Sequence, residues 1–163
     1  MALIKSISGI RGTIGGVPDE NLTPIDAVKF AAAYGFWLKN HVHKTRIKVV
    51  VGRDARLSGE MVQNLVQYTL IGLGIDVVDL GLSTTPTVEV AVTMEQADGG
   101  IILTASHNPK QWNALKLLNN QGEFLNAQEG EEILRIAADN SAVFAEVDAL
   151  GTLSHNDTYI QRH

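Results

Sequence analysis

Short apolar runs alternate along the chain with segments in which apolar residues recur at helical spacing. The runs IKVVV at 47–51, IDVVDL at 75–80 and GGIILTA at 99–105 each have the length and composition of a buried strand. Between the first two, the apolar residues of 58–73 fall on one face of a helix. Alternating units of this kind predict an α/β layered sheet with at least three parallel strands.

The helix expected over 58–73 has a start signal and a clear division of its faces. Ser58 is the predicted N-cap. Met61 lies on the apolar face, whereas Gln63 and Gln67 lie largely off it. The pattern therefore predicts a buried methionine and two solvated glutamines.

Further elements are predicted from their boundaries. Thr-Pro pairs begin the expected helices 24–39 and 86–97. The second of these also alternates locally like a strand, but two parallel strands need a crossover, which favours the helix. An asparagine followed three residues later by a glutamate predicts a capping box and a helix over 126–138. A short strand over 116–119 is expected to turn at 120–122.

Composition narrows the class of protein. The chain has 163 residues, which suggests one domain, and its 45% hydrophobic content is ordinary for a globular protein. The absence of cysteine excludes disulfides, thiolate metal sites and a cysteine nucleophile. A net charge of −5 gives no support for nucleic-acid or membrane-surface binding. With no secretory signal or transmembrane run apparent, we expect a cytoplasmic protein with no nucleic-acid and no membrane partner.

Polar clusters follow the three predicted strands. They are Gly-Arg-Asp-Ala-Arg at 52–56, Gly-Leu-Ser-Thr-Thr at 81–85 and Ser-His-Asn at 106–108. In open α/β sheets, ligands bind beyond the carboxyl ends of the strands. We therefore expect the three clusters to share one rim of the sheet.

The residue types at this rim suit an anion better than a metal. Arg53, Arg56 and Lys116 supply cations, and Arg11 in Gly-Ile-Arg-Gly adds another. For the segment 53–56, a second interpretation is equally weighted: its arginines and aspartate pair with each other in a structural loop.

Other chemistries lack their motifs. Ser106 is not surrounded by the Gly-x-Ser-x-Gly of a hydrolase nucleophile elbow, and neither a Walker motif nor a Gly-x-Gly-x-x-Gly follows a strand. His41 and His43 are expected to act at the negative end of a helix rather than as metal ligands. Trp37 is expected in the core, and Trp112 in a loop at the surface or an interface.

Four motifs together resemble a known family. Thr-Ala-Ser-His-Asn-Pro at 104–109, Asn-Ala-Leu-Lys at 113–116, Gly-Ile-Arg-Gly at 9–12 and Gly-Arg-Asp-Ala-Arg at 52–56 occur in the order found in the α-D-phosphohexomutases. Ala114 stands where the family pattern has glycine. The resemblance covers most of the chain and is most specific at the serine motif.

The resemblance implies a role for each matched residue. Ser106 would be the phosphoserine that exchanges its phosphoryl group with a sugar phosphate, and its phosphate would also bind Mg²⁺. Lys116 and Arg11 would flank the transferring group, with Lys116 a candidate general base. His107 and Asn108 would hold the loop and contact the substrate and its phosphate. Ser106, Lys116, Arg11 and His107 are thus the expected catalytic residues.

The resemblance also implies an architecture and a set of partners. Residues 1–150 would form the first domain, a three-layer α/β/α fold with a mixed, mainly parallel sheet, and 151–163 would be a linker or the start of the next domain. The partners would be a hexose phosphate, a hexose bisphosphate activator, Mg²⁺ and domains 2–4 of the same chain. The family's aspartate-rich metal loop is absent from this sequence, so we expect the chain alone to be inactive. The alternative is a free-standing, non-catalytic module that binds a phosphorylated ligand.

Overall fold

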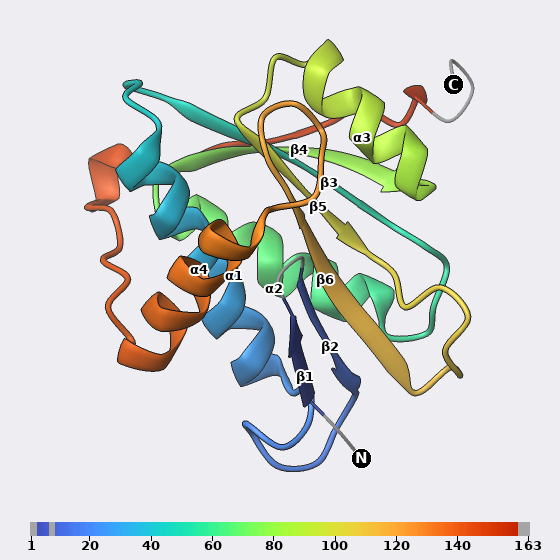
Figure 1. The fold of residues 1–163 in the computed structure, drawn as a ribbon. Helices are drawn as coiled ribbons and strands as arrows, with labels where there is room; N and C mark the ends of the chain where they lie inside the picture. The colour runs from blue at the N-terminus through green and yellow to red at the C-terminus, as the bar shows by residue number, and fades with distance from the viewer. Residues whose placement is uncertain (1–2, 7–8, 160–163) are drawn as a thin grey trace.

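The computed structural model describes residues 3–6 and 9–159, which form one seven-stranded sheet with helices on both faces (Figure 1). The strands are β1 (Leu3–Ser6), β2 (Gly9–Thr13), β3 (Ile47–Arg53), β4 (Ile75–Leu82), β5 (Gly99–Leu103), β6 (Trp112–Leu118) and β7 (Leu153–His155). The helices are α1 (Pro24–His41), α2 (Gly59–Gly72), α3 (Thr85–Met94), α4 (Ala127–Asp139) and the short 3₁₀ helix η1 (Val147–Ala149).

The sheet is mixed, as expected, but among the described residues only three of its six strand pairings are parallel, so it is not mainly parallel. Its strand order is β1-β2-β6-β5-β3-β4-β7. The pairs β5·β3, β3·β4 and β4·β7 are parallel, whereas β1·β2, β2·β6 and β6·β5 are antiparallel. The strand expected over 116–119 begins earlier, at Trp112, and extends between β2 and β5. Trp112 is therefore half-buried at the start of a strand rather than in a loop.

Two hydrophobic clusters show that the fold has three layers. One cluster joins α1, α2 and α4 to one face of the sheet, and Trp37 belongs to it, as expected. The other joins α3 to the opposite face, where Val88 and Val92 pack on Val50 and Ile102. Figure 1 shows α3 standing apart from the other helices. The predicted α/β/α arrangement is confirmed.

Capping contacts confirm the predicted starts of α1 and α4, whereas α3 begins one residue earlier than predicted, at Thr85. Thr23 and Asp26 form a capping box at α1, and Asn126 and Glu129 form one at α4. Thr84 caps α3, which settles the helix-or-strand ambiguity of that segment in favour of the helix.

Helix α2 departs from the prediction in its buried face. Met61 is 41% exposed, whereas Gln63 and Gln67 are buried. Gln63 is accommodated because its amide oxygen accepts from Arg53 Nε at 2.7 Å and its amide nitrogen donates to Asp79 Oδ1 at 2.7 Å. A polar side chain that is fully hydrogen-bonded can be buried, and the apolar pattern alone does not reveal such partners.

Tyr34 of α1 joins the two central strands where the sheet changes from parallel to antiparallel. Its buried hydroxyl donates to Leu118 O of β6 at 2.5 Å and accepts from Gly100 N of β5 at 3.0 Å. A side chain at Gly99 would collide with this hydroxyl. Burial raises the pKa of Tyr34 far above its ordinary value, so the hydroxyl stays protonated.

The segment after Gly151 adds a strand to the edge of the sheet. β7 pairs in parallel with β4, and Asp76 accepts hydrogen bonds from Thr152 N and Thr152 Oγ1 at 3.0 and 2.9 Å. None of the described helices has both the length and the apolar character needed to cross a membrane.

Candidate active site

The carboxyl ends of β3, β4 and β5 meet at one edge of the sheet. Asp54 N, just past β3, donates to Leu103 O of β5 at 3.1 Å, and Ser83 N, just past β4, donates to Arg53 O at 2.8 Å. The prediction that the polar clusters share a rim is confirmed. The polar cluster that follows β4 forms mainly the start of α3, where the Thr84 side chain caps the helix.

Between β5 and β6 runs a segment that we call the serine loop, residues 104–111. Ser106 is exposed in it and has a φ of 50°, in the left-handed region. A residue other than glycine in that region costs on the order of 1–3 kcal/mol and persists only where its surroundings hold it. Ser106 N donates to Thr104 Oγ1 at 3.1 Å, and Asn108 N donates to Ala105 O at 2.9 Å. The loop is therefore folded on itself around the serine.

Arg56 ties the serine loop to the end of β3. Its Nη2 donates to Ser106 O at 2.7 Å and to Asn108 O at 2.8 Å. Its Nη1 donates to Pro109 O at 2.8 Å and to Trp112 O at 3.2 Å. The guanidinium thus binds four backbone carbonyls along the loop.

The Asp54 carboxylate binds both Arg56 and the start of the serine loop. Its Oδ2 accepts from Arg56 Nε at 3.2 Å and from Thr104 Oγ1 at 2.7 Å. Arg53 is also used internally, since its Nη1 donates to Asp54 O at 3.2 Å. Of the two interpretations of segment 53–56, the structure favours the self-paired loop: its arginines shape the rim.

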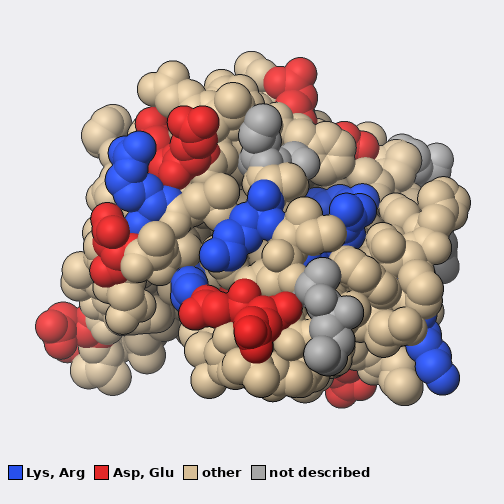
Figure 2. All heavy atoms as spheres, turned by 60° about the horizontal axis from the view of Figure 1, so that its bottom comes forward, with Lys and Arg blue, Asp and Glu red and all other residues tan. Residues whose placement is uncertain are grey.

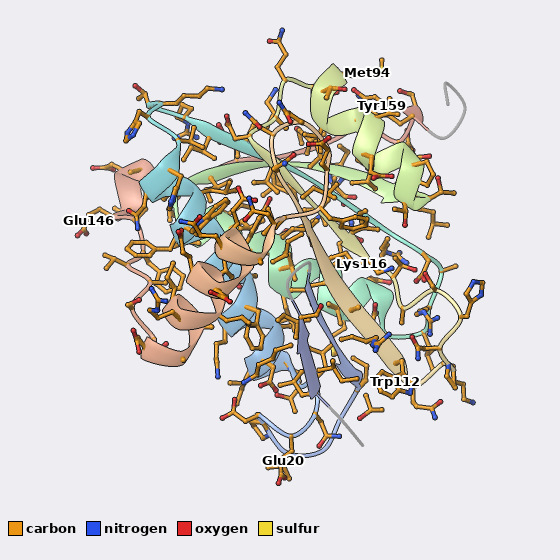
Figure 3. All side chains as sticks on the ribbon, in the orientation of Figure 1. Glu20, Met94, Trp112, Lys116, Glu146 and Tyr159 are labelled. Atoms are coloured by element: carbon orange, nitrogen blue, oxygen red, sulfur yellow. The ribbon has the colours of Figure 1, made fainter. Side chains whose placement is uncertain are left out.

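Lys116 approaches the serine directly. It lies on β6 between Ile102 of β5 and Gly9 of β2, and its Nζ donates to Ser106 Oγ at 3.4 Å. Figure 3 labels Lys116 and Trp112 on the same strand. Although Lys116 is ten positions beyond Ser106 in the sequence, the serine loop brings the two side chains into contact.

Arg11 lies on the neighbouring strand. It is exposed on β2 opposite Ala114 of β6, and its guanidinium lies 5.9 Å from the centre of the Trp112 ring. Arg11 and Lys116 line a cavity of about 190 Å³ together with Ser6 and other residues of these strands. The structure brings Arg11 and Lys116 together, and Lys116 provides the recorded contact with Ser106.

The alanine in the second motif fits its position. Ala114 is buried inside β6, and it is not among the described residues with a positive φ. A glycine is therefore not required there for backbone reasons. Its neighbour Asn113 is fully buried, and its Nδ2 donates to Ser58 Oγ at 3.0 Å. This contact, which the sequence analysis missed, takes the place of the expected Ser58 cap of α2.

His107 and Asn108 contribute differently to the loop. Asn108 is held through its backbone by Ala105 and Arg56. The His107 side chain is exposed and has no hydrogen bond or ion pair with any other described residue. It is thus accessible to a ligand at the rim.

No metal centre is formed within the described part of the chain. There, no three His, Cys, Asp or Glu side chains gather as metal ligands would. His41 instead lies 3.2 Å from Glu132 of α4, with its Nδ1 2.9 Å from Trp37 O, and His43 is exposed. The arrangement at the rim is one of cations and hydroxyls. On the face that Figure 2 shows, Lys and Arg side chains lie interspersed with Asp and Glu side chains.

Such an arrangement suits the transfer of an anion. An exposed hydroxyl with an ammonium at contact distance, a second cation on the adjacent strand and a rigid loop provides positioning and charge stabilisation. These are the main requirements of phosphoryl transfer.

Comparison with known proteins gives the same direction. Residues 4–143 match the family described as phosphoglucomutase/phosphomannomutase, alpha/beta/alpha domain I. A phosphoglucomutase/phosphomannomutase of Thermococcus kodakarensis is 43% identical over 113 residues, covering 68% of this chain and 25% of the relative. A phosphoglucosamine mutase of Ligilactobacillus salivarius is 37% identical over 147 residues, covering 88% of this chain and 33% of the relative.

Solved structures agree on the fold. The crystal structure of a phosphoglucomutase/phosphomannomutase family protein from Burkholderia thailandensis matches 98% of this chain with a TM-score of 0.78 and 25% identity, over 34% of its own length. A putative phosphomannomutase from Thermus thermophilus matches 97% with a TM-score of 0.76 and 28% identity. The chain spans about a quarter to a third of the curated relatives that it matches. It belongs to the phosphoglucomutase/phosphomannomutase family and corresponds to that family's α/β/α domain I.

Proposed function

We propose that this chain is the phosphoserine-bearing first domain of a cytoplasmic phosphohexomutase. The complete enzyme would interconvert hexose 1-phosphate and hexose 6-phosphate through a bisphosphorylated sugar. The observation that carries the proposal is the contact of 3.4 Å between Lys116 Nζ and Ser106 Oγ in a loop that holds the serine in a left-handed conformation.

The transfer step follows from these groups. With a phosphoryl group on Ser106, a sugar hydroxyl attacks phosphorus, the bond from phosphorus to Oγ breaks, and a bond to the sugar oxygen forms. Lys116 is the candidate general base: its ammonium gives a proton to Ser106 Oγ as that oxygen leaves with the electron pair of the broken bond, and the resulting amine takes the proton of the attacking sugar hydroxyl. Arg11 stabilises the charge spread over the phosphoryl oxygens. The reverse step, with the bisphosphate turned around, returns the other phosphoryl group to Ser106.

Mg²⁺ fits this site in part. The exposed Ser106 can present a phosphate oxygen, but the described residues hold no cluster of carboxylates or imidazoles to complete the coordination. The remaining ligands would come from another domain. When bound, the ion would neutralise phosphate charge.

The size of the relatives supports a divided active site. Because the matched relatives are three to four times as long as the region they share with this chain, we propose that domains 2–4 supply the metal loop and the contacts to the sugar. The boundary expected at residue 150 would then lie later, because β7 pairs with β4 of the first domain, and the connection to the second domain would begin beyond β7.

Steady-state kinetics of the complete protein with the 1-phosphates of glucose, mannose and glucosamine test the proposal, in the presence of the matching hexose bisphosphate. We expect turnover with at least one sugar and its loss in Ser106→Ala. Ser141→Ala, which removes another exposed hydroxyl beyond α4, is the matched control and should keep full activity. Turnover in Ser106→Ala equal to that of the unmodified protein would refute the proposal.

A further inference from the structure

The Arg56 side chain has no donor left for a substrate. A guanidinium carries five N–H groups. In this chain, Nε binds Asp54, and the four N–H groups of Nη1 and Nη2 have four carbonyl acceptors in and beside the serine loop. The side chain is only 11% exposed. Arg56 is therefore built into the rim and is not an open phosphate-binding cation.

Both backbone groups of the reacting serine are held by this network. Ser106 N donates to Thr104 Oγ1 at 3.1 Å, and Ser106 O accepts from Arg56 Nη2 at 2.7 Å. These two contacts act on the peptide groups on either side of the Ser106 Cα. They therefore oppose rotation of the residue out of its left-handed conformation.

One carboxylate connects the two contacts. Asp54 Oδ2 accepts from both Thr104 Oγ1 and Arg56 Nε. Because Asp54 follows β3 directly and its N–H donates to Leu103 O, the carboxylate is fixed to the ends of two parallel strands. Through this carboxylate, the position of the serine is fixed relative to the ends of β3 and β5.

We propose, on the basis of the function proposed above, that Arg56 is a positioning residue for phosphoryl transfer. Together with Asp54 and Thr104, it fixes the direction of the Ser106 hydroxyl toward Lys116. Its effect is on the geometry of the reacting oxygen, so it acts on the chemical step and not on sugar binding.

Arg56→Lys in the complete protein tests this inference, because lysine keeps the charge but cannot form the guanidinium fork. We expect kcat to fall about 100-fold, as for small displacements of reacting groups, while KM for the hexose phosphate stays within about twofold. Arg46→Lys is the matched control. Arg46 pairs with Asp76, away from the serine loop, and its replacement should leave both constants unchanged.

Thr104→Val separates positioning from general stability. It removes the partner of Ser106 N at nearly constant volume, and we expect a similar loss of kcat. Since both residues act on Ser106, the loss in the double variant Arg56→Lys/Thr104→Val should be smaller than the product of the single losses. Thermal unfolding of all variants is measured alongside; losses of kcat that simply follow the melting temperature, or multiply without coupling, would overturn the inference.

The outcomes also distinguish this inference from the proposed function. An inactive Ser106→Ala combined with an unchanged kcat in Arg56→Lys refutes positioning alone. A raised KM with unchanged kcat in Arg56→Lys would make Arg56 a substrate ligand, which also refutes positioning. Full activity in Ser106→Ala refutes the proposed function itself.

Discussion

At the scale of single residues, the site depends on what lies around one hydroxyl. A serine has no intrinsic reactivity at neutral pH, and it gains none here from a neighbouring catalytic base of the hydrolase type. Three features surround it instead: the ammonium of Lys116 at 3.4 Å, the guanidinium of Arg11 on the adjacent strand, and a hydrogen bond from Arg56 to the serine's own carbonyl oxygen. In the proposed function, this combination would stabilise a phosphate on Ser106 and favour its transfer.

Lys116→Met in the complete protein should lower kcat by about 10²- to 10⁴-fold, because it removes both the nearest cation and the candidate base. Steady-state kinetics provide the measurement. Lys110→Met, which changes an exposed lysine of the same loop, is the control and should have little effect. Equal activity of the two variants would remove Lys116 from the mechanism.

At the scale of secondary-structure elements, the central strands of the sheet position the site. β5 and β6 carry the serine loop, and Tyr34 binds both strands at their far ends through one buried hydroxyl. That hydroxyl occupies the space that a side chain at position 99 would need. The contact of Tyr34 with the two strands therefore requires Gly99. Helix α1 is thereby anchored to the strands that position Ser106 and Lys116.

Tyr34→Phe should lower the free energy of unfolding by about 1–3 kcal/mol, because Gly100 N and Leu118 O lose their buried partner. Urea denaturation of the variant and the unmodified protein measures this difference. Tyr68→Phe is the matched control, since Tyr68 is 59% exposed, and should stay within about 0.5 kcal/mol. A loss no larger than that of the control would show that the hydroxyl bridge is not stabilising.

The edge strand β7 is held by a carboxylate that titrates. Partial burial raises the pKa of Asp76, but hydrogen bonds from Arg46 and Thr152 outweigh this effect and hold the pKa below its ordinary value of 3.8. Because the folded pKa is the lower one, the ionised carboxylate stabilises the fold at all pH values above 3.8. This contribution is lost as the pH falls through the folded pKa.

Asp76→Asn should therefore flatten the dependence of the urea midpoint on pH below about pH 4. The unmodified protein should lose stability steeply in that range, and Asp148→Asn, which changes an exposed aspartate in η1, should retain the steep loss. An unchanged slope in Asp76→Asn would show that this carboxylate does not couple β7 to pH.

The elements differ in how far the sequence predicts them. β3, β4 and β5 are short, mainly apolar segments, and α1 and α4 begin at capping boxes, so local signals suffice. β1 and β2 are short, and Gly9 is required because a side chain there would collide with Leu115 O, a contact that no local pattern announces. The burial of Gln63 likewise depends on partners in β3 and β4.

The site shows the same division. The motifs single out Ser106 and Lys116, and the fold brings them together. The role of Asp54 and Thr104 around the serine was not predicted, because it depends on the ends of two strands meeting in space. For the same reason, the sequence alone does not distinguish the two interpretations of segment 53–56.

At the scale of the whole molecule, we propose that the chain provides the reacting serine but not the residues that bind the sugar. The rim is open, the described residues form no metal centre, and the matched relatives extend well beyond this domain. The 163-residue chain alone is therefore expected to show no mutase turnover with glucose 1-phosphate and glucose 1,6-bisphosphate. A coupled spectrophotometric assay measures this, with the complete protein as positive control; substantial turnover by the chain alone would contradict a divided active site.

In the proposed function, Ser106 carries the phosphoryl group between sugar oxygens. Phosphopeptide mass spectrometry of the complete protein, incubated with a hexose bisphosphate and then with excess hexose 1-phosphate, tests it most directly. We predict one phosphoryl group on Ser106 that is gained from the bisphosphate and exchanges with the added sugar, and none in Ser106→Ala. A phosphoryl group that exchanges at the same rate on another residue, or turnover without any phosphorylated Ser106, would contradict it.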